Sequence, residues 1–423
     1  PLDQAEAYNL LIIQYTVRGQ YLEAIQAGRE TLKLLAVDLP QTDFQRVFDT
    51  EYSKLQASLQ QRQLADLLEL EEITAPDAKL VVKLLSNLGS AAYRYEQQLW
   101  QVIVVLSLNF FCDHGNSPES CYGYSNYVTL LGSVLGEYKA GYESCLVSLS
   151  LSERYQNSTQ KSRACFILSN FVHSWVKPVQ QADVINREGI QAGLESGEIQ
   201  YVGYMLSYRI TNLFFQGKSL ELLLEDLLEA ISFCQSTKNQ WAIDALSGYQ
   251  LTLLNLMGET TNPIWQKLPV VDNNDFSKAC EAHHSFSGLC RYYILNCLTL
   301  YLDNQLRQAL AVSELAAELL PYILGVVSIA EYYFYQSLVL TRLYATAGAT
   351  EKAEFQLKLL DNKQHLQVWA EHCPENFYHL YKLVEAEIAQ LDGQIWDAAQ
   401  GYDQAIQAAR QQGFISHEAL AND

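Results

Sequence analysis

A spacing of small, aromatic and glycine residues that recurs about every 34 residues constrains this chain more than any other feature. Near the N-terminus, Gly19 stands where a tight turn is needed, and Ala24 follows where a small side chain lets two helices pack closely. The residues before the glycine fall on one helical face: Tyr8, Leu11, Ile12 and Tyr15. This arrangement predicts a pair of antiparallel helices.

The same frame returns later in the chain. Gly348 and Gly393 are followed at the same interval by Ala353 and Ala398, a weaker copy surrounds Gly217, and another copy ends at Pro321. The spacing matches the tetratricopeptide pattern, in which each hairpin buries its apolar face only by stacking on its neighbours. We therefore predict a single all-α domain, a right-handed α-solenoid of tetratricopeptide-like hairpins with about twenty helices. Regular repeats are expected near 5–38, 203–236, 290–321, 334–361 and 379–412.

The stretches between these repeats are less regular but still read as helices. Their expected ranges are 42–70, 77–94, 98–111, 120–137, 141–155 and 161–176, separated by breakers such as 74–76, 114–118 and Asn262-Pro263. None of the breakers has the composition of a flexible interdomain linker. Residues 41–160 could pack as a distinct sub-lobe of the same domain.

Composition supports the helical fold and limits the partners. Only 9 Pro and 21 Gly are available for the tight turns of a sandwich or barrel. The net charge is −20, with 48 acidic and 28 basic residues, so the chain should repel phosphate backbones and anionic lipids. The apolar runs at 99–111 and 319–330 are too short to span a bilayer. We expect a cytoplasmic protein that neither binds nucleic acid nor inserts into membranes.

Two groups of residues could be mistaken for chemical sites. Gly217-Lys218-Ser219 resembles the end of a phosphate-binding loop, but Asn212 replaces the required glycine, so these residues are expected to form a turn. The densest group of possible metal ligands is Cys280, His283, His284, Cys290 and Cys297, but it lacks zinc-like spacing, and Cys297 falls at a packing position. We predict no catalytic residue, no metal and no cofactor.

Aromatic and basic residues indicate where a ligand would bind. The chain has 27 tyrosines, and inward-facing positions of the first helix of each hairpin are often contact residues in a solenoid. For any one aromatic residue, packing remains more frequent than ligand contact. The groove residues expected from this register are Tyr204, Arg291, Tyr335, Leu338 and Arg342.

Several short segments together resemble one protein family. They are 21–25 (YLEAI) running to Leu39-Pro40, 114–117 (HGNS), 193–197 (GLESG) and 417–421 (HEALA). The resemblance is to the helical-repeat region of large bacterial, especially cyanobacterial, multi-sensor hybrid kinases. In that family the region follows a serine/threonine kinase domain and a STAND-type ATPase and precedes a GAF domain and a histidine kinase. The resemblance implies neighbouring kinase and ATPase domains as partners, and it supplies no catalytic residue.

Two functional hypotheses follow. The first is a non-catalytic sensor segment that binds a peptide, protein or small effector in its concave groove and relays this to attached signalling domains. The alternative is a structural spacer or oligomerisation scaffold, which would bury an exposed apolar surface on a second copy. Pro1 in place of an initiator methionine, and a helix-like sequence at 415–423, lead us to expect a segment of a longer protein.

Overall fold

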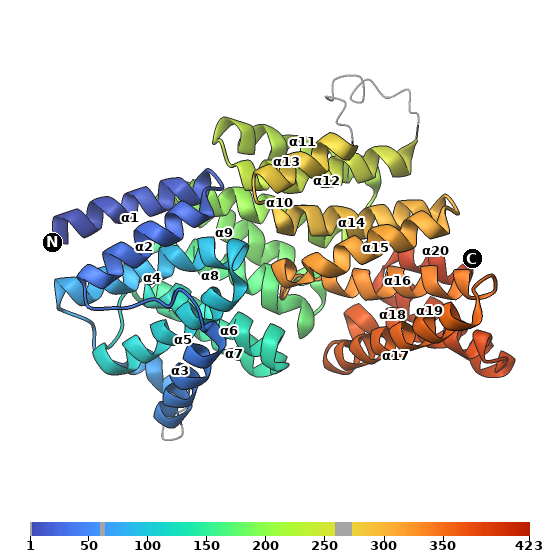
Figure 1. Ribbon diagram of the computed structural model, residues 1–423, viewed down its shortest axis with the longest axis horizontal. Helices are drawn as coiled ribbons and strands as arrows, with labels where there is room; N and C mark the ends of the chain where they lie inside the picture. Colours follow the sequence, from blue (N-terminus) through green and yellow to red (C-terminus); the bar gives the residue numbers. More distant parts are fainter. Residues whose placement is uncertain (1, 60–63, 259–272) are drawn as a thin grey trace.

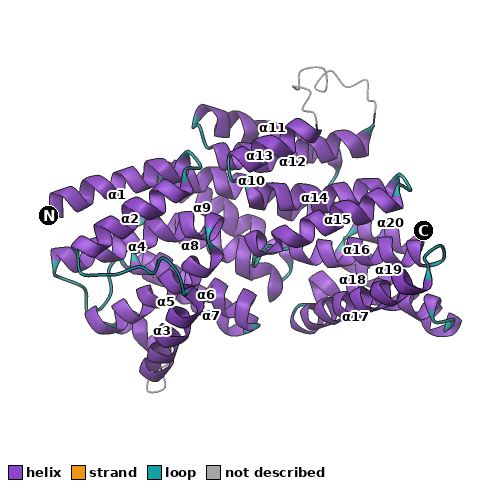
Figure 2. Ribbon diagram, viewed as in Figure 1, coloured by secondary structure: helices purple, strands orange, loops and turns teal. Residues whose placement is uncertain are grey.

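The computed structural model describes residues 2–59, 64–258 and 273–423, which fold into twenty α-helices (Figures 1 and 2). An isolated bridge between Glu72 and Asn116 is the only β-structure in the described part of the chain. The predicted all-α helical-repeat fold is confirmed. The two termini lie toward opposite ends of the long axis (Figure 1).

The first ten helices are α1 (Leu2–Val17), α2 (Tyr21–Leu34), α3 (Phe44–Leu59), α4 (Pro76–Tyr95), α5 (Gln97–His114), α6 (Ser120–Leu135), α7 (Tyr138–Arg154), α8 (Ser158–Ile167), α9 (Ala182–Ser196) and α10 (Ile199–Phe215). The remaining ten are α11 (Leu220–Ser236), α12 (Gln240–Met257), α13 (Asn273–Ala282), α14 (Phe286–Leu302), α15 (Leu306–Leu319), α16 (Ser328–Tyr344), α17 (Ala349–His372), α18 (Pro374–Leu391), α19 (Ile395–Gln412) and α20 (Ile415–Asn422).

Helices that follow one another in the chain pack as hairpins. Such pairs include α1/α2, α10/α11, α14/α15, α16/α17 and α18/α19. Within 41–160, α4 packs on α5 and α6 packs on α7, while α3 lies against α5. Asn262-Pro263 lies outside the described residues.

Local sequence signals place several helix ends. Pro76 occupies the first turn of α4, where its missing N–H costs nothing. The side chain of Asn157 accepts a hydrogen bond from the backbone N–H of Gln160 and so caps α8. Gly197 and Gly413 adopt left-handed conformations directly after α9 and α19, which is the common way to end a helix.

Two segments expected as continuous helices depart from α-helical geometry in part. In 42–70, α3 covers Phe44–Leu59, and Leu64–Glu69 form a 3₁₀ helix. In 161–176, α8 gives way to a π-helical turn at Leu168–Val172 and then to a 3₁₀ turn at His173–Trp175. Asn170 in the π-helical turn exchanges side-chain hydrogen bonds with Asn186 of α9, so this irregular segment is held by buried polar contacts.

The helices form an inner and an outer layer. From α4 to α20, every second helix contacts the next member of this series, as the inner helices of a stacked-hairpin solenoid do. The inner helix α16 buries residues on all sides, whereas the outer helix α19 buries a stripe of small residues (Ala398, Gly401, Ala405 and Ala409). Contacts between α10 and α16 bring distant parts of the inner layer together.

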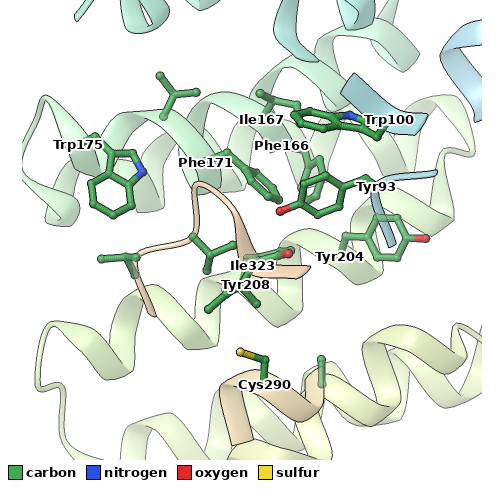
Figure 3. Packing of buried hydrophobic residues seen from close by; sticks show 14 of the residues in the cluster. Tyr93, Trp100, Phe166, Ile167, Phe171, Trp175, Tyr204, Tyr208, Cys290 and Ile323 are labelled. Carbon is green, nitrogen blue, oxygen red and sulfur yellow. The ribbon is translucent and has the colours of Figure 1, made fainter. Parts of the chain in front are cut away.

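The connection between α15 and α16 passes through the middle of the inner layer. Ile323 in the 3₁₀ turn Leu320–Ile323 is fully buried and belongs to the same hydrophobic core as Tyr208 (Figure 3). The Tyr93 hydroxyl donates a hydrogen bond to the carbonyl of Leu324 at 2.7 Å, and Trp175 Nε1 donates to the carbonyl of Gly325 at 2.8 Å. Because these donors satisfy two carbonyls of the connection, its backbone can lie buried in the inner layer.

Among the described residues, no helix combines the length and the apolarity needed to cross a bilayer.

Candidate functional site: an apolar cavity walled by α20

The five predicted groove residues occupy two different environments. Tyr204 and Arg291 are each 1% exposed and Leu338 is 3% exposed, so these three belong to the core. Tyr335 is also nearly buried but lines a cavity, and Arg342 lies at the mouth of the same cavity. The five residues lie on α10, α14 and α16, and only Tyr335 and Arg342 line the cavity.

Arg291 and Tyr204 take part in a buried aromatic cluster. The Arg291 guanidinium lies 4.8 Å from the ring centre of Tyr208 and 5.3 Å from that of Trp241, and its Nη1 donates to Thr211 Oγ1 at 2.9 Å. Arg94 stacks on the ring of Tyr204 at 4.1 Å. Cation–π contacts of this kind stabilise buried guanidinium groups, so a packing role accounts for both predicted residues.

The cavity has a volume of about 580 Å³ and lies where the C-terminal ends of α10, α12 and α14 meet α16 and α20. This volume is within the range of roughly 300–1,000 Å³ that is usual for ligand sites. The lining residues are Phe214, Gly217, Lys218, Ser219, Leu220, Leu256, Leu298, Tyr301, Leu302, Tyr335, Arg342, Ile415, Ser416, His417, Ala419, Leu420 and Asp423. Most of them are aliphatic or aromatic.

Helix α20 closes one side of this cavity and packs against the α10–α11 turn. Gly217 in that turn has φ of +69°, and a Cβ atom there would lie 2.8 Å from Ser416 Oγ. Two separate reasons therefore favour glycine at this position: the left-handed backbone conformation and the close approach of α20. The predicted turn at Gly217-Lys218-Ser219 is present, and it places Lys218 at the cavity.

A pair of buried histidines attaches α20 to α18. His417 Nδ1 lies 2.9 Å from His379 Nε2, and both rings pack against Phe414. Desolvation lowers the pKa of His417 to about 3, and desolvation together with the neighbouring His417 lowers the pKa of His379 well below its usual value. Both imidazoles are therefore neutral near pH 7 and hold this wall through a neutral hydrogen bond.

The mouth and the buried end of the cavity differ in polarity. The buried end is formed by Phe214, Leu298, Tyr335 and His417, each at most 8% exposed. At the mouth, the Arg342 guanidinium lies 3.7 Å from the Asp423 carboxylate and 5.5 Å from the Tyr301 ring, and Lys218 is exposed. The arrangement can hold an apolar group inside while a charged group remains near solvent.

A buried acid lies behind the cavity wall. Glu331 is fully buried, and its Oε1 accepts a hydrogen bond from the Tyr335 hydroxyl at 3.3 Å. Desolvation raises the pKa of Glu331 to about 7. Tyr335 thus lines the cavity while its hydroxyl is already bound to Glu331, which is not a lining residue.

The cysteines and histidines considered as metal ligands have other contacts. Cys290 Sγ contacts the carbonyl of Ala316 at 3.6 Å, and His283 Nδ1 lies 3.0 Å from Asp244 Oδ2. Burial raises the pKa of Cys297 to about 12, so its thiol stays protonated and unreactive. Within the described residues, no three potential ligands are grouped closely enough to hold a metal ion.

The sequence offered little signal for the remaining cavity residues. Lys218 lies in a turn, and Leu302 and Ile415 resemble ordinary surface residues of separate repeats. They meet only because α20 returns to the α10–α11 turn, about two hundred residues earlier in the chain.

Comparison with known proteins places the chain in no established family. No family model matches it, and no curated protein matches it. Among solved structures, it is similar to a Rap protein complexed with competence and sporulation factor, with a TM-score of 0.49 and 10% sequence identity over 97% of this chain and 99% of that one. A likeness of this extent assigns neither a site nor a function.

Proposed function

We propose that this chain is a non-catalytic sensor module that binds a peptide, a protein segment or a small effector in the cavity between α10 and α20. The observation that carries the proposal is the cavity itself, an apolar space of about 580 Å³ with a few charged groups at its mouth. Its lining comes from helices far apart in the sequence. A bound molecule would therefore contact α10, α16 and α20 together.

We further propose that the module relays occupancy of the cavity to attached kinase and ATPase domains. The sequence resemblance to hybrid kinases is the support for that context. Helix α20 is the element suited to the relay, because it contributes Ile415, His417 and Leu420 to the cavity wall. The relay requires that α20 exchange between two arrangements. A ligand shifts this equilibrium only if it binds the two arrangements with different affinity.

The test is ligand capture with a blocked cavity. Leu302 lines the cavity and is 52% exposed, so Leu302→Trp should fill the space without disturbing the core. Leu194→Trp on α9 is the matched control, because Leu194 is 47% exposed and lies outside the cavity. We expect molecules identified by mass spectrometry with the wild type and with Leu194→Trp to be lost with Leu302→Trp. Equal capture by all three proteins would contradict the proposal.

The alternative function, an oligomerisation scaffold, is favoured by the outer face of α17. Leu357 is 70% exposed, Leu360 is 54% exposed and Val368 is 40% exposed along this helix. Exposed leucines at helical spacing are typical of a surface that another protein covers. Under this alternative, light scattering would show a stable dimer that Leu357→Glu converts to a monomer, while Leu302→Trp leaves it intact.

A further inference from the structure

We infer that the ligand of the cavity is an amphiphilic acid, with an aliphatic body inside the cavity and one carboxylate at the mouth beside Arg342. This inference rests on the proposed function, because it specifies the chemistry of the molecule that the cavity binds. Three observations support it. They are the charged residues of the lining, the apolar walls, and the hydrogen bonds that buried polar atoms already make.

The lining of the cavity carries more positive than negative side chains in a strongly acidic protein. Its charged residues are Lys218, Arg342 and Asp423, whereas the whole chain has a net charge of −20. Lys218 forms no ion pair with any described residue. A ligand carboxylate beside Arg342 would gain an opposite charge, and hydrogen bonds to ionised groups are stronger than neutral ones.

The contact that holds Arg342 is weak enough to be exchanged. Its Nη2 lies 3.7 Å from Asp423 Oδ2, and the two side chains are 47% and 69% exposed. Exposed ion pairs of this kind contribute little, since water and salt screen them. The Asp423 carboxylate therefore occupies the position that a ligand carboxylate would take, and it competes with the ligand.

The interior suits an aliphatic chain better than a peptide. Leu256, Leu298, Leu302 and Leu420 form much of its wall. Two buried polar atoms of the lining residues already have partners, because the Tyr335 hydroxyl donates to Glu331 and His417 Nδ1 pairs with His379.

A peptide backbone brings an N–H and a C=O with nearly every residue, and burying these groups without partners is costly. An acyl chain carries no such groups. The walls therefore favour a small aliphatic acid, and a peptide becomes an alternative outcome of the test.

The experiment compares three probes that share one tail. Decanoate, decanol and decyltrimethylammonium are titrated into the full chain by calorimetry at low ionic strength. We expect decanoate to bind at least about tenfold more tightly than decanol, which corresponds to about 1.4 kcal/mol, and the ammonium probe to bind most weakly.

Two substitutions should act in opposite directions. Arg342→Gln should weaken decanoate binding about tenfold and leave decanol binding unchanged, because decanol has no charge to lose. Asp423→Asn should strengthen decanoate binding, because it removes the competing carboxylate. Arg187→Gln is the control, since Arg187 pairs with Asp183 on α9, outside the cavity.

The outcomes separate this inference from the proposed function. If decanoate and decanol bind equally tightly, or if Arg342→Gln has no effect on decanoate binding, the inference that the ligand is an acid is wrong. If an amidated apolar peptide displaces decanoate and binds more tightly, the inference that the ligand has an aliphatic body is wrong. In either case the proposed function stands if Leu302→Trp still abolishes binding, and it fails if Leu302→Trp changes no binding at all.

Discussion

His417 on α20 and His379 on α18 share a buried hydrogen bond, with Nδ1 and Nε2 2.9 Å apart and both side chains 2% exposed. The bond needs at least one imidazole to be neutral, and burial penalises protonation of either ring. Since α20 forms a wall of the cavity, the protonation state of this pair bears on the ligand site as well as on stability.

The first prediction concerns acid destabilisation through this pair. The pKa of His417 is lowered to about 3 in the folded chain, compared with 6.5 for a free histidine. A lowered folded pKa contributes stability that is fully present above about pH 6.5 and is lost as the pH falls toward 3. At pH 5 the loss from His417 is on the order of 2 kcal/mol.

His417→Gln should therefore reduce the decline in unfolding free energy between pH 7 and pH 5, as measured by urea denaturation. His365→Gln is the control, because His365 is partly exposed on α17. If the unfolding free energy of His417→Gln falls between pH 7 and pH 5 as much as that of the wild type and of His365→Gln, the histidine pair does not cause the decline.

Glu331 gives a second prediction of opposite sign. Its pKa is raised from 4.5 to about 7, so its favourable contribution is present below pH 4.5 and is lost as the pH rises through 7. Glutamine resembles the protonated acid but does not ionise. Glu331→Gln should thus stabilise the chain at pH 7.5 by on the order of 2–3 kcal/mol relative to its effect at pH 4.5. Thermal unfolding at the two pH values measures the difference, and an equal effect at both would exclude ionisation of Glu331 as the cause.

The repeat pattern could be predicted because its causes are local. Gly19 and Ala24 act within a single hairpin, and the same interval separates Gly393 from Ala398, so each hairpin carries its own signal. Arg291 and Tyr335, chosen as groove residues from the same interval, lie on α14 and α16. Such signals depend on neighbours in the chain, and they remain visible without the fold.

The width of the groove could not be predicted in this way. It depends on small rotations between successive hairpins, which accumulate along a solenoid and leave no pattern in the sequence. Pro321 indicated the end of a repeat, but not that the following residues enter the centre and accept hydrogen bonds from Tyr93 and Trp175. Arg291 was therefore expected to contact a ligand although its guanidinium packs on Tyr208.

A third prediction tests the packing between α18 and α19. Ala398 is 1% exposed, and the neighbouring Gly401 lies so close to Ala386 that an added Cβ would approach its Cβ to 2.8 Å. Ala398→Leu should overpack this interface and destabilise the C-terminal hairpin by roughly 1–3 kcal/mol. Ala399→Leu, at the adjacent exposed position, should change the melting temperature little. An unchanged melting temperature for Ala398→Leu would mean that the repeat frame is wrong there.

The last prediction asks how tightly α20 is held against the α10–α11 turn. Gly217 and Gly393 share nearly the same backbone conformation, with φ of +69° and +75°. An added Cβ at Gly217 would meet Ser416, while at Gly393 it would meet no described atom within 4 Å. Gly393→Ala should therefore cost only the strain of a left-handed alanine, about 1–2 kcal/mol. Gly217→Ala should cost this strain and roughly 1–3 kcal/mol more from overpacking.

Hydrogen exchange distinguishes local from global effects of these two substitutions. We expect Gly217→Ala to lower amide protection throughout α20, because the turn can no longer approach Ser416, and Gly393→Ala to leave α20 protected. Since α20 supplies Ile415 and Leu420 to the cavity, ligand binding should weaken in Gly217→Ala alone. Equal costs and equal protection in the two variants would mean that the contact of Gly217 with α20 does not hold this wall of the cavity in place.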